Sequence, residues 1–309
     1  MNRFSFHYSL FRIRFWTVLL LMFSSVSSIA AQSPSPPALT INTEPNTNVW
    51  IDEVRRGTTD GSGRLVLQKL SAGRHILRLR AIGYKESTTS LLPRQRRSIS
   101  VKLVPTTDQA ELLFQQAEAA REQAKDDQQR QAAVEIYQQS LKLRAAQAAA
   151  HVGLARLYMD LSEFENALRE IDAARRIRPV YPEASAVEGR INREAAFTGE
   201  AIKSFRRAMR EGRGFQPEAH VGLARVFEDK GEFNDAVVEY RKAIDQLSDS
   251  EPVIYQLLGA VYEKLQEPKE AVAAYEKYLQ LAPNGSYAGA VRSILQQLKR
   301  EAAGEDIIP

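Results

Sequence analysis

The sequence predicts an α+β multidomain protein in which a small all-β sandwich precedes an all-α superhelix of paired helices. Three observations carry this prediction. Apolar residues alternate at every second position between residues 38 and 105, the hydrophobic period changes to about 3.6 after Asp108, and a unit of about 34 residues then recurs in phase. The chain has 309 residues, enough for two domains of ~100–200 residues each.

The first 31 residues have the composition of a secretion signal. The positive charges are those of Arg3, Arg12 and Arg14. An apolar run at 15–23 and small residues at 28–30 follow, so we expect cleavage near Ala30. The alternative is a retained anchor, although the run is shorter than the ~20 residues of a spanning helix. We therefore expect an exported protein, periplasmic or extracellular and associated with the cell envelope, with no transmembrane span after cleavage.

Composition excludes several chemistries and several partners. The absence of cysteine excludes disulfides, thiolate catalysis, zinc–cysteine sites and a lipid-modified cysteine. The net charge of +4 falls to about +1 without the three leader arginines, so no nucleic-acid partner is expected. Residues 38–105 carry 12 Lys and Arg against 5 Asp and Glu, whereas residues 106–309 carry 27 against 33. This asymmetry predicts either an anionic partner for the basic part or contact between the two parts.

Residues 32–37 read Gln-Ser-Pro-Ser-Pro-Pro and predict an extended spacer. Residues 38–105 predict a small antiparallel sandwich, because short alternating runs are separated by turn segments such as Asp60-Gly61-Ser62-Gly63. The alternating residues are Leu39 and Ile41; Val49 and Ile51; Leu65 and Leu67; Ile76, Leu77 and Leu79; and Ile99, Val101 and Leu103.

The spacing of turns in this part resembles the PEGA domain, a β-sandwich of bacterial envelope proteins. The matching residues are Pro45, Val49-Trp50-Ile51-Asp52, Gly57-Thr58, Leu70-Ser71-Ala72-Gly73-Arg74-His75 and Ala81-Ile82-Gly83-Tyr84. The segment 59–64 also looks like the turn of carboxypeptidase-regulatory-type sandwiches. The resemblance implies a sandwich over residues 38–105 and implies little about a ligand.

From Asp108 onward the chain has the composition and period of helices, and Asp108 followed by Glu111 predicts a capping box. Four alanines, spaced 34, 35 and 35 residues apart, mark a repeat: Ala167, Ala201, Ala236 and Ala271. Each is followed four residues later by a large residue, namely Ile171, Phe205, Tyr240 and Tyr275. Twelve residues before each alanine stand Ala155, Gly189, Ala224 and Gly259, whose small size lets two helices approach closely.

This pattern resembles the tetratricopeptide repeat, a pair of antiparallel helices in ~34 residues. The resemblance implies units at 148–181, 182–216, 217–251 and 252–285, after an atypical first hairpin at 108–147 in which Arg121 replaces a small residue. A capping helix at 286–302 and a tail at 303–309 complete the chain. Such an array has a concave groove, lined by the first helix of each pair, that accepts peptides or helices.

The groove positions of the family hold an arginine in three successive units: Arg156, Arg190 and Arg225, with Arg193 one turn beyond. The residues four positions earlier, Val152, Ala186, Val221 and Gln256, form a mostly apolar floor. Because guanidinium groups bind carboxylates bidentately, this ladder predicts a protein partner with an acidic or carboxylate-terminated peptide. The alternative is that Glu183, Glu218 and Glu228 neutralise the ladder as ordinary ion pairs. The Lys-and-Asn clamp of chaperone-binding relatives is absent from these positions, so no chaperone role is expected.

No pattern of catalytic residues is found, and the sequence predicts a non-enzyme without cofactor or metal. His151 and His220 occupy the same helical position in two units, which favours packing over metal binding. The scattered acids Asp52, Glu53 and Asp60 favour a solvated surface over a calcium site.

The predicted function is therefore a protein-interaction scaffold. The alternative function is binding of an anionic envelope polymer or lipid through the basic sandwich. Its candidate residues are Arg55, Arg56, Arg94, Arg96 and Arg97.

Overall fold

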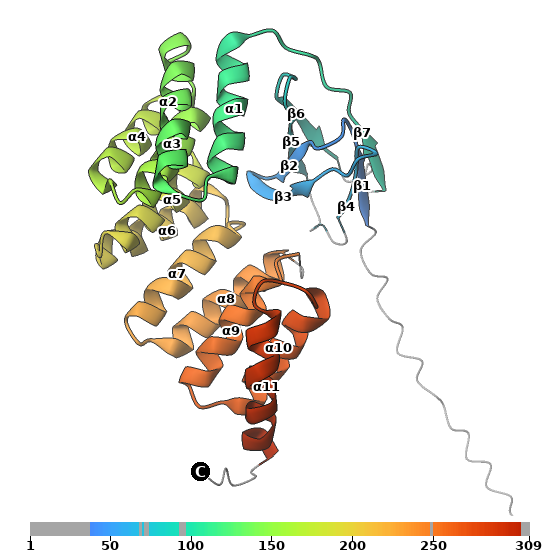
Figure 1. Ribbon diagram of the computed structural model, residues 1–309, viewed down its shortest axis with the longest axis vertical. Helices are drawn as coiled ribbons and strands as arrows, with labels where there is room; N and C mark the ends of the chain where they lie inside the picture. The colour runs from blue at the N-terminus through green and yellow to red at the C-terminus, as the bar shows by residue number, and fades with distance from the viewer. Residues whose placement is uncertain (1–37, 68–69, 71–73, 93–96, 248–249, 304–309) are drawn as a thin grey trace, which may run out of the picture. The chain divides into compact units, whose positions relative to one another are not determined.

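A computed structural model describes residues 38–67, 70, 74–92, 97–247 and 250–303, all within one structural unit that spans residues 36–309. The predicted signal (1–31), spacer (32–37) and residues 304–309 of the predicted tail lie outside the described residues, as do Arg94 and Arg96. Figure 1 shows a β module, which we define as the described part of residues 38–105, followed by helices in chain order from green to red.

The β module contains two sheets that share one apolar core. Its strands are β1 (Leu39–Asn42), β2 (Asn48–Ile51), β3 (Val54–Thr58), β4 (Arg64–Leu67), β5 (His75–Arg80), β6 (Ser87–Leu91) and β7 (Ser98–Ser100). The order is β4-β1-β7 in one sheet and β3-β2-β5-β6 in the other. Leu39 and Ile41 from the first sheet and Leu77 and Leu79 from the second are all buried in the shared core. These four residues lie at alternating positions of their strands, as the period-two pattern predicts.

The predicted antiparallel pairing needs one correction, because β1 and β7 are parallel. The chain leaves the four-stranded sheet after β6 and enters the other sheet at its far edge, where it runs in the direction of β1.

The turn at 60–63 forms as its sequence predicts. Asp60 Oδ1 accepts hydrogen bonds from the backbone N–H groups of Ser62 and Arg64, both at 2.9 Å. Gly63 is required there, since its φ is 77° and an added Cβ would lie 1.9 Å from the Thr43 carbonyl oxygen.

The helices form five antiparallel pairs, and a further helix packs on the last pair. Their bounds are α1 (Gln109–Gln123), α2 (Asp127–Leu143), α3 (Ala148–Asp160), α4 (Phe164–Ile177), α5 (Pro182–Glu194), α6 (Thr198–Glu211), α7 (Pro217–Asp229), α8 (Phe233–Leu247), α9 (Val253–Lys264), α10 (Pro268–Leu281) and α11 (Ala288–Ala303). We call α1–α11 the helical array. Asp108 caps α1 by accepting from the N–H groups of Ala110 and Glu111. The predicted capping box is only half formed, because the Asp108 N–H donates to the Thr106 hydroxyl instead of to Glu111.

The repeated residues pack as their spacing predicts. The four anchor alanines have no exposed surface. Gly189 and Gly259 face the rings of the same pair, since an added Cβ would lie 2.6 Å from Phe205 and 2.6 Å from Tyr275, respectively. The small residues therefore set the spacing between the two helices of a pair, and the rings fill the space beside them.

Candidate functional site

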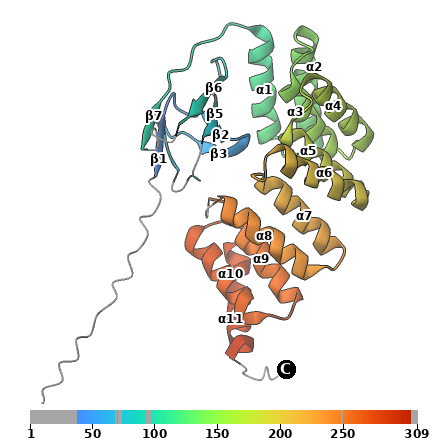
Figure 2. The same cartoon turned by 180° about the vertical axis from the view of Figure 1, so that it is seen from behind.

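The β module lies against the helical array, and the two enclose a cavity of about 390 Å³. The views in Figures 1 and 2 both place β2 and β3 beside α1, the first helix of the array. Strands β2, β3 and β5 line one side, and the first helix of every pair (α1, α3, α5, α7 and α9) contributes to the other. We call this space the interdomain cavity. Its position confirms the sequence-based alternative in which the basic and acidic parts of the chain contact each other.

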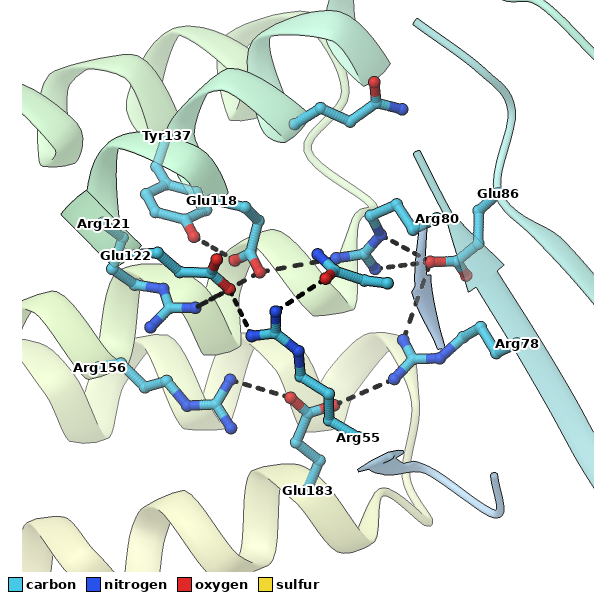
Figure 3. A network of polar contacts seen from close by, with 12 residues as sticks. Arg55, Arg78, Arg80, Glu86, Glu118, Arg121, Glu122, Tyr137, Arg156 and Glu183 are labelled. Carbon is cyan, nitrogen blue, oxygen red and sulfur yellow. Dashed lines mark hydrogen bonds and ion pairs between the residues drawn. The ribbon is translucent and has the colours of Figure 1, made fainter. Parts of the chain in front are cut away.

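Glu183, near the start of α5, lines the cavity and joins the β module to the helical array through ion pairs (Figure 3). Arg156 of α3 donates a hydrogen bond of 2.9 Å to its Oε1, while Arg78 of β5 lies 3.6 Å from its Oε2. Burial opposes ionisation of the Glu183 carboxyl, but Arg156 and Arg78 outweigh it and hold the pKa at about 2. Glu183 is therefore a carboxylate at any physiological pH.

Arg80 of β5 is the second buried link. Its guanidinium lies 5.1 Å from the ring centroid of Trp50 in β2 and 4.5 Å from that of Phe114 in α1. It donates to Glu86 at 2.6 and 2.9 Å and lies 3.6 Å from Glu118 of α1. Burial opposes ionisation of Arg80, but these carboxylates more than compensate, so its pKa is raised. The stacked cation holds the module against α1 by both charge and ring contact.

Glu118 also accepts a hydrogen bond from the Tyr137 hydroxyl of α2 (Figure 3). Burial raises the pKa of Tyr137 and the neighbouring carboxylate raises it further, so the phenol stays protonated as a donor. Burial opposes ionisation of Glu118, but Arg121 and Arg80 lower its pKa. Arg121 occupies the place where a repeat normally has a small residue, and here it serves this charge network at 3.5 Å from Glu118.

The tip of the β2–β3 hairpin enters the array beside this network. Glu53, the second turn residue, accepts a hydrogen bond of 2.9 Å from Arg178 at the end of α4 and lies 3.3 Å from Arg78. The next residue, Val54, packs against the apolar cluster of α7–α11. Asp52, the first turn residue, contacts His75 at 2.5 Å and accepts from the Ile76 N–H at 2.9 Å.

Aliphatic residues also line the cavity. They are Ala149, Pro217, Val221, Leu247, Val253 and Ile254. Glu251 lines the cavity as well, and burial raises its pKa. Burial lowers the pKa of Arg56 in β3, which is not among the lining residues. The cavity lining thus combines fixed charges with aliphatic carbon, which suits a side chain or peptide segment of mixed character.

Comparison with known proteins identifies the array. Models of the tetratricopeptide repeat match residues 123–182, 187–252 and 252–284. The chain is a tetratricopeptide repeat (TPR) protein. The predicted fold class, a β part followed by a TPR superhelix, is confirmed, and a TPR fold indicates a protein-interaction scaffold. TPR proteins are generally non-catalytic.

Solved structures of low sequence identity share the fold. pilF of Pseudomonas aeruginosa has a TM-score of 0.53 at 14% identity, over 64% of this chain and 87% of that chain. PilW, a widely conserved type IV pilus biogenesis factor, has a TM-score of 0.53 at 16% identity, over 65% and 88%. The APC/C hetero-tetramer Cut9-Hcn1 has a TM-score of 0.51 at 14% identity, over 61% of this chain but only 36% of that one. No curated protein sequence matches the chain.

The three arginines predicted to line the TPR groove form ion pairs with glutamates. Arg156 pairs with Glu183 at 2.9 Å, Arg190 with Glu218 at 3.5 Å and Arg225 with Glu228 at 3.8 Å. Glu183, Glu218 and Glu228 are the three glutamates that the alternative interpretation of the sequence expects to neutralise these arginines. The side chain of Arg156 is 17% exposed, whereas those of Arg190 and Arg225 are 43% and 41% exposed, so only the latter two present much free surface.

The remaining groove residues differ in accessibility. Arg193 contacts Asp229 at 2.7 Å and Glu194 at 2.9 Å. Val152 is fully buried in the core of α3–α5, where no partner can reach it. Val221 is half-buried and lines the interdomain cavity, and Gln256 of α9 is half-buried.

The described residues among those proposed for polymer binding, Arg55, Arg56 and Arg97, do not share one face. Arg55 and Arg56 lie in β3, where Arg55 pairs with Glu122 of α1 at 2.8 Å. Arg97 lies beside the other sheet, where its carbonyl accepts from the Thr40 N–H. Of the described members of this set, Arg55 lines the cavity, Arg56 is half-buried in β3 and Arg97 is exposed.

Sequence reasoning missed Arg78, Arg80 and Trp50 as parts of the site. Arg78 and Arg80 alternate with Leu77 and Leu79 in β5, so they project from the opposite face of the sheet. Two arginines on one face of an otherwise apolar strand were the available signal.

Within the described ranges, no helix is long and apolar enough to cross a membrane. Of the residues placed in the structure, no three His, Cys, Asp or Glu side chains gather as a metal site. The equivalent histidines each contact a glutamate: His151 lies 2.6 Å from Glu170, and His220 lies 2.6 Å from Glu239.

Proposed function

We propose that the chain is an exported, non-catalytic scaffold whose TPR groove binds a peptide or protein partner in the cell envelope. The observation that carries the proposal is the interdomain cavity, to which every first helix of the five pairs contributes. A space of about 390 Å³ falls in the range of specific ligand pockets, and its aliphatic lining residues offer an anchor for a partner side chain.

The binding surface we propose consists of Val221, which lines the cavity, and of Gln256, Arg190, Arg225 and Arg193, which lie outside its lining. Glu218, the ion-pair partner of Arg190, also lines the cavity. Val152 and Arg156 are left out, since one is buried in the core and the other is committed to Glu183. The Arg190–Glu218 pair is loose at 3.5 Å, and both side chains are more than a third exposed. Exposed pairs contribute only ~0–1 kcal/mol, so a carboxylate of an acidic peptide can replace Glu218 as the partner of Arg190.

Export, envelope location and the PEGA character of residues 38–105 belong to the proposal as well. Export is supported by the basic and then apolar leader, and the PEGA resemblance by Gly57 in β3 and Gly83 in the turn after β5, both of which have positive φ. The unit limits given by the repeat spacing are kept as part of this proposal.

Selection of a displayed peptide library against the full chain tests the function. Selected peptides should be rich in acidic and aliphatic residues, and Arg190→Glu with Arg225→Glu should weaken their binding about tenfold or more by adding repulsion. Arg206→Glu with Arg210→Glu, exposed on second helix α6, is the matched control and should leave affinity unchanged. Equal loss in both double variants, or no selected peptide, would contradict the proposal.

Binding of an anionic envelope polymer by the β module is not favoured by the placement of Arg55, Arg56 and Arg97, the described arginines of that proposal. Salt-dependent retention of the full chain on purified cell-wall material, lost on Arg97→Glu but kept in the groove double variant, would revive it.

A further inference from the structure

Three consecutive residues of the β2–β3 hairpin each contact the TPR array. Glu53 accepts a hydrogen bond of 2.9 Å from Arg178, Val54 packs on the apolar cluster of α7–α11, and Arg55 donates one of 2.8 Å to Glu122 of α1. A short hairpin therefore contacts the end of α4, the last repeats and the first helix at once. A peptide bound in the groove would likewise contact several helices at once.

The turn that presents these residues has an unfavourable backbone. Ile51 and Val54 pair directly, which leaves Asp52 and Glu53 as a two-residue turn with φ values of 51° and 68°. Such turns favour Asn-Gly or Asp-Gly, because glycine takes positive φ without steric cost. A glutamate at the glycine position is explained by what its carboxylate does, since it is 18% exposed and lies between Arg178 and Arg78. The contacts of Glu53 with Arg178 and Arg78 therefore compensate for its unfavourable backbone conformation.

We propose that the β2–β3 hairpin is a resident ligand of the TPR groove, and that the protein partner displaces it with a segment of the same chemistry: an acidic residue, an aliphatic residue and a basic residue in succession at a turn. This inference rests on the proposed function and adds to it the class of partner and the means of regulation.

The partner would bind the same residues of the helical array that the hairpin contacts in this structure. Arg178, whose guanidinium lies 4.4 Å from the ring centroid of Tyr181, takes the carboxylate. The aliphatic side chain packs on Val221 and Ile254, which line the cavity, and Glu122 takes the basic residue. Because the hairpin is joined to the array by the chain, its effective concentration is high and a free segment competes poorly.

The test uses a peptide of this chain, residues 48–58, closed into a ring through its ends, which face each other as Asn48 and Thr58 in the hairpin. Its affinity is measured by fluorescence polarisation against the full chain and against Glu53→Gly with Val54→Ser. Glycine favours the turn, so the variant hairpin still forms while losing both contacts. We expect the double variant to bind the ring at least tenfold more tightly than the unaltered chain.

Two controls sharpen the result. Ser62→Gly with Val66→Ser makes the same kinds of change at an exposed turn and strand, and should bind like the unaltered chain. A ring carrying Glu53→Gln and Val54→Ser should bind the double variant at least tenfold more weakly. Equal affinities for the unaltered chain and the double variant, equal affinities for the two rings, or no binding of the ring at all would overturn the proposal. If library peptides still bound through Arg190 and Arg225, the scaffold function would stand and this inference alone would fall.

Discussion

Arg156 of one repeat donates a hydrogen bond of 2.9 Å to Glu183 at the start of the next repeat. This places the first arginine of the predicted ladder in a structural ion pair that also receives Arg78 from the β module. The pair is mostly withdrawn from solvent, with 17% and 15% of the two side chains exposed. One interaction therefore fixes both the stacking of two repeats and the docking of the module.

Glu183→Gln should reduce the free energy of unfolding by about 3–5 kcal/mol, because it removes the carboxylate to which the mostly buried Arg156 donates and one of the carboxylates beside Arg78. Urea unfolding followed by circular dichroism measures the change. Glu122→Gln is the control, since the Arg55–Glu122 pair is 43% and 37% exposed and should contribute less than about 1 kcal/mol. Similar losses in the two variants would show that burial of the Glu183 pair has no energetic consequence.

The stability of the chain should fall in acid through the same carboxyl group. The pKa of Glu183 is lowered from 4.5 to about 2 in the folded protein, so its contribution is complete above pH 4.5 and is lost as the pH falls toward 2. Between pH 6 and pH 3 the unaltered chain should lose about 2 kcal/mol more than Glu183→Gln does. Denaturant titrations of both proteins at the two pH values measure this difference. If the unfolding free energies of the two proteins depended on pH in the same way, the pKa of Glu183 would not be lowered in the folded protein.

The sequence predicts the array well because its packing repeats. Ala201 and Phe205 recur in phase with their counterparts, so the same two helical faces meet in every unit. The docking of the module has no such signal. Arg80 contacts Phe114 and Glu118 across the junction of the two parts, and nothing periodic in either part indicates that contact. Only the opposite charges of the two parts suggested it.

The strands show the same division. Alternating Leu39 and Ile41 predict β1, but β3 (VRRGT) and β6 (STTSL) have little apolar content, and the sequence analysis did not find them. Both are edge strands of the four-stranded sheet, so neither needs two buried faces. Polar composition hid β3, the strand that supplies Val54 and Arg55 to the cavity.

Gly189→Ala should destabilise the array by about 1–3 kcal/mol, because the added methyl group would lie 2.6 Å from the Phe205 ring. Gly199→Ala is the matched control in the same repeat: a Cβ there meets no atom within 4 Å, and alanine is the better helix former. It should leave stability unchanged or raise it by up to about 1 kcal/mol. Thermal unfolding of both variants compares them, and equal midpoints would refute the close approach of α5 and α6.

Gln115→Ala should loosen the β module from the array. The Gln115 side chain is 3% exposed and accepts from the Gly83 N–H at 2.8 Å while its amide donates to the Tyr84 carbonyl at 2.7 Å. Its removal deprives two backbone groups of their partners, which costs about 1–3 kcal/mol for a buried group.

Hydrogen exchange at Gly83 and Tyr84 should therefore accelerate in Gln115→Ala, with little change in the cores of α5 to α10. The exposed neighbour Gln116 on the same helix provides the control, and Gln116→Ala should leave both exchange and stability unchanged. Unaltered exchange at the Gly83 turn in Gln115→Ala would mean that Arg80 and its ring contacts hold the module by themselves. The bidentate amide would then be a consequence of docking and not one of its causes.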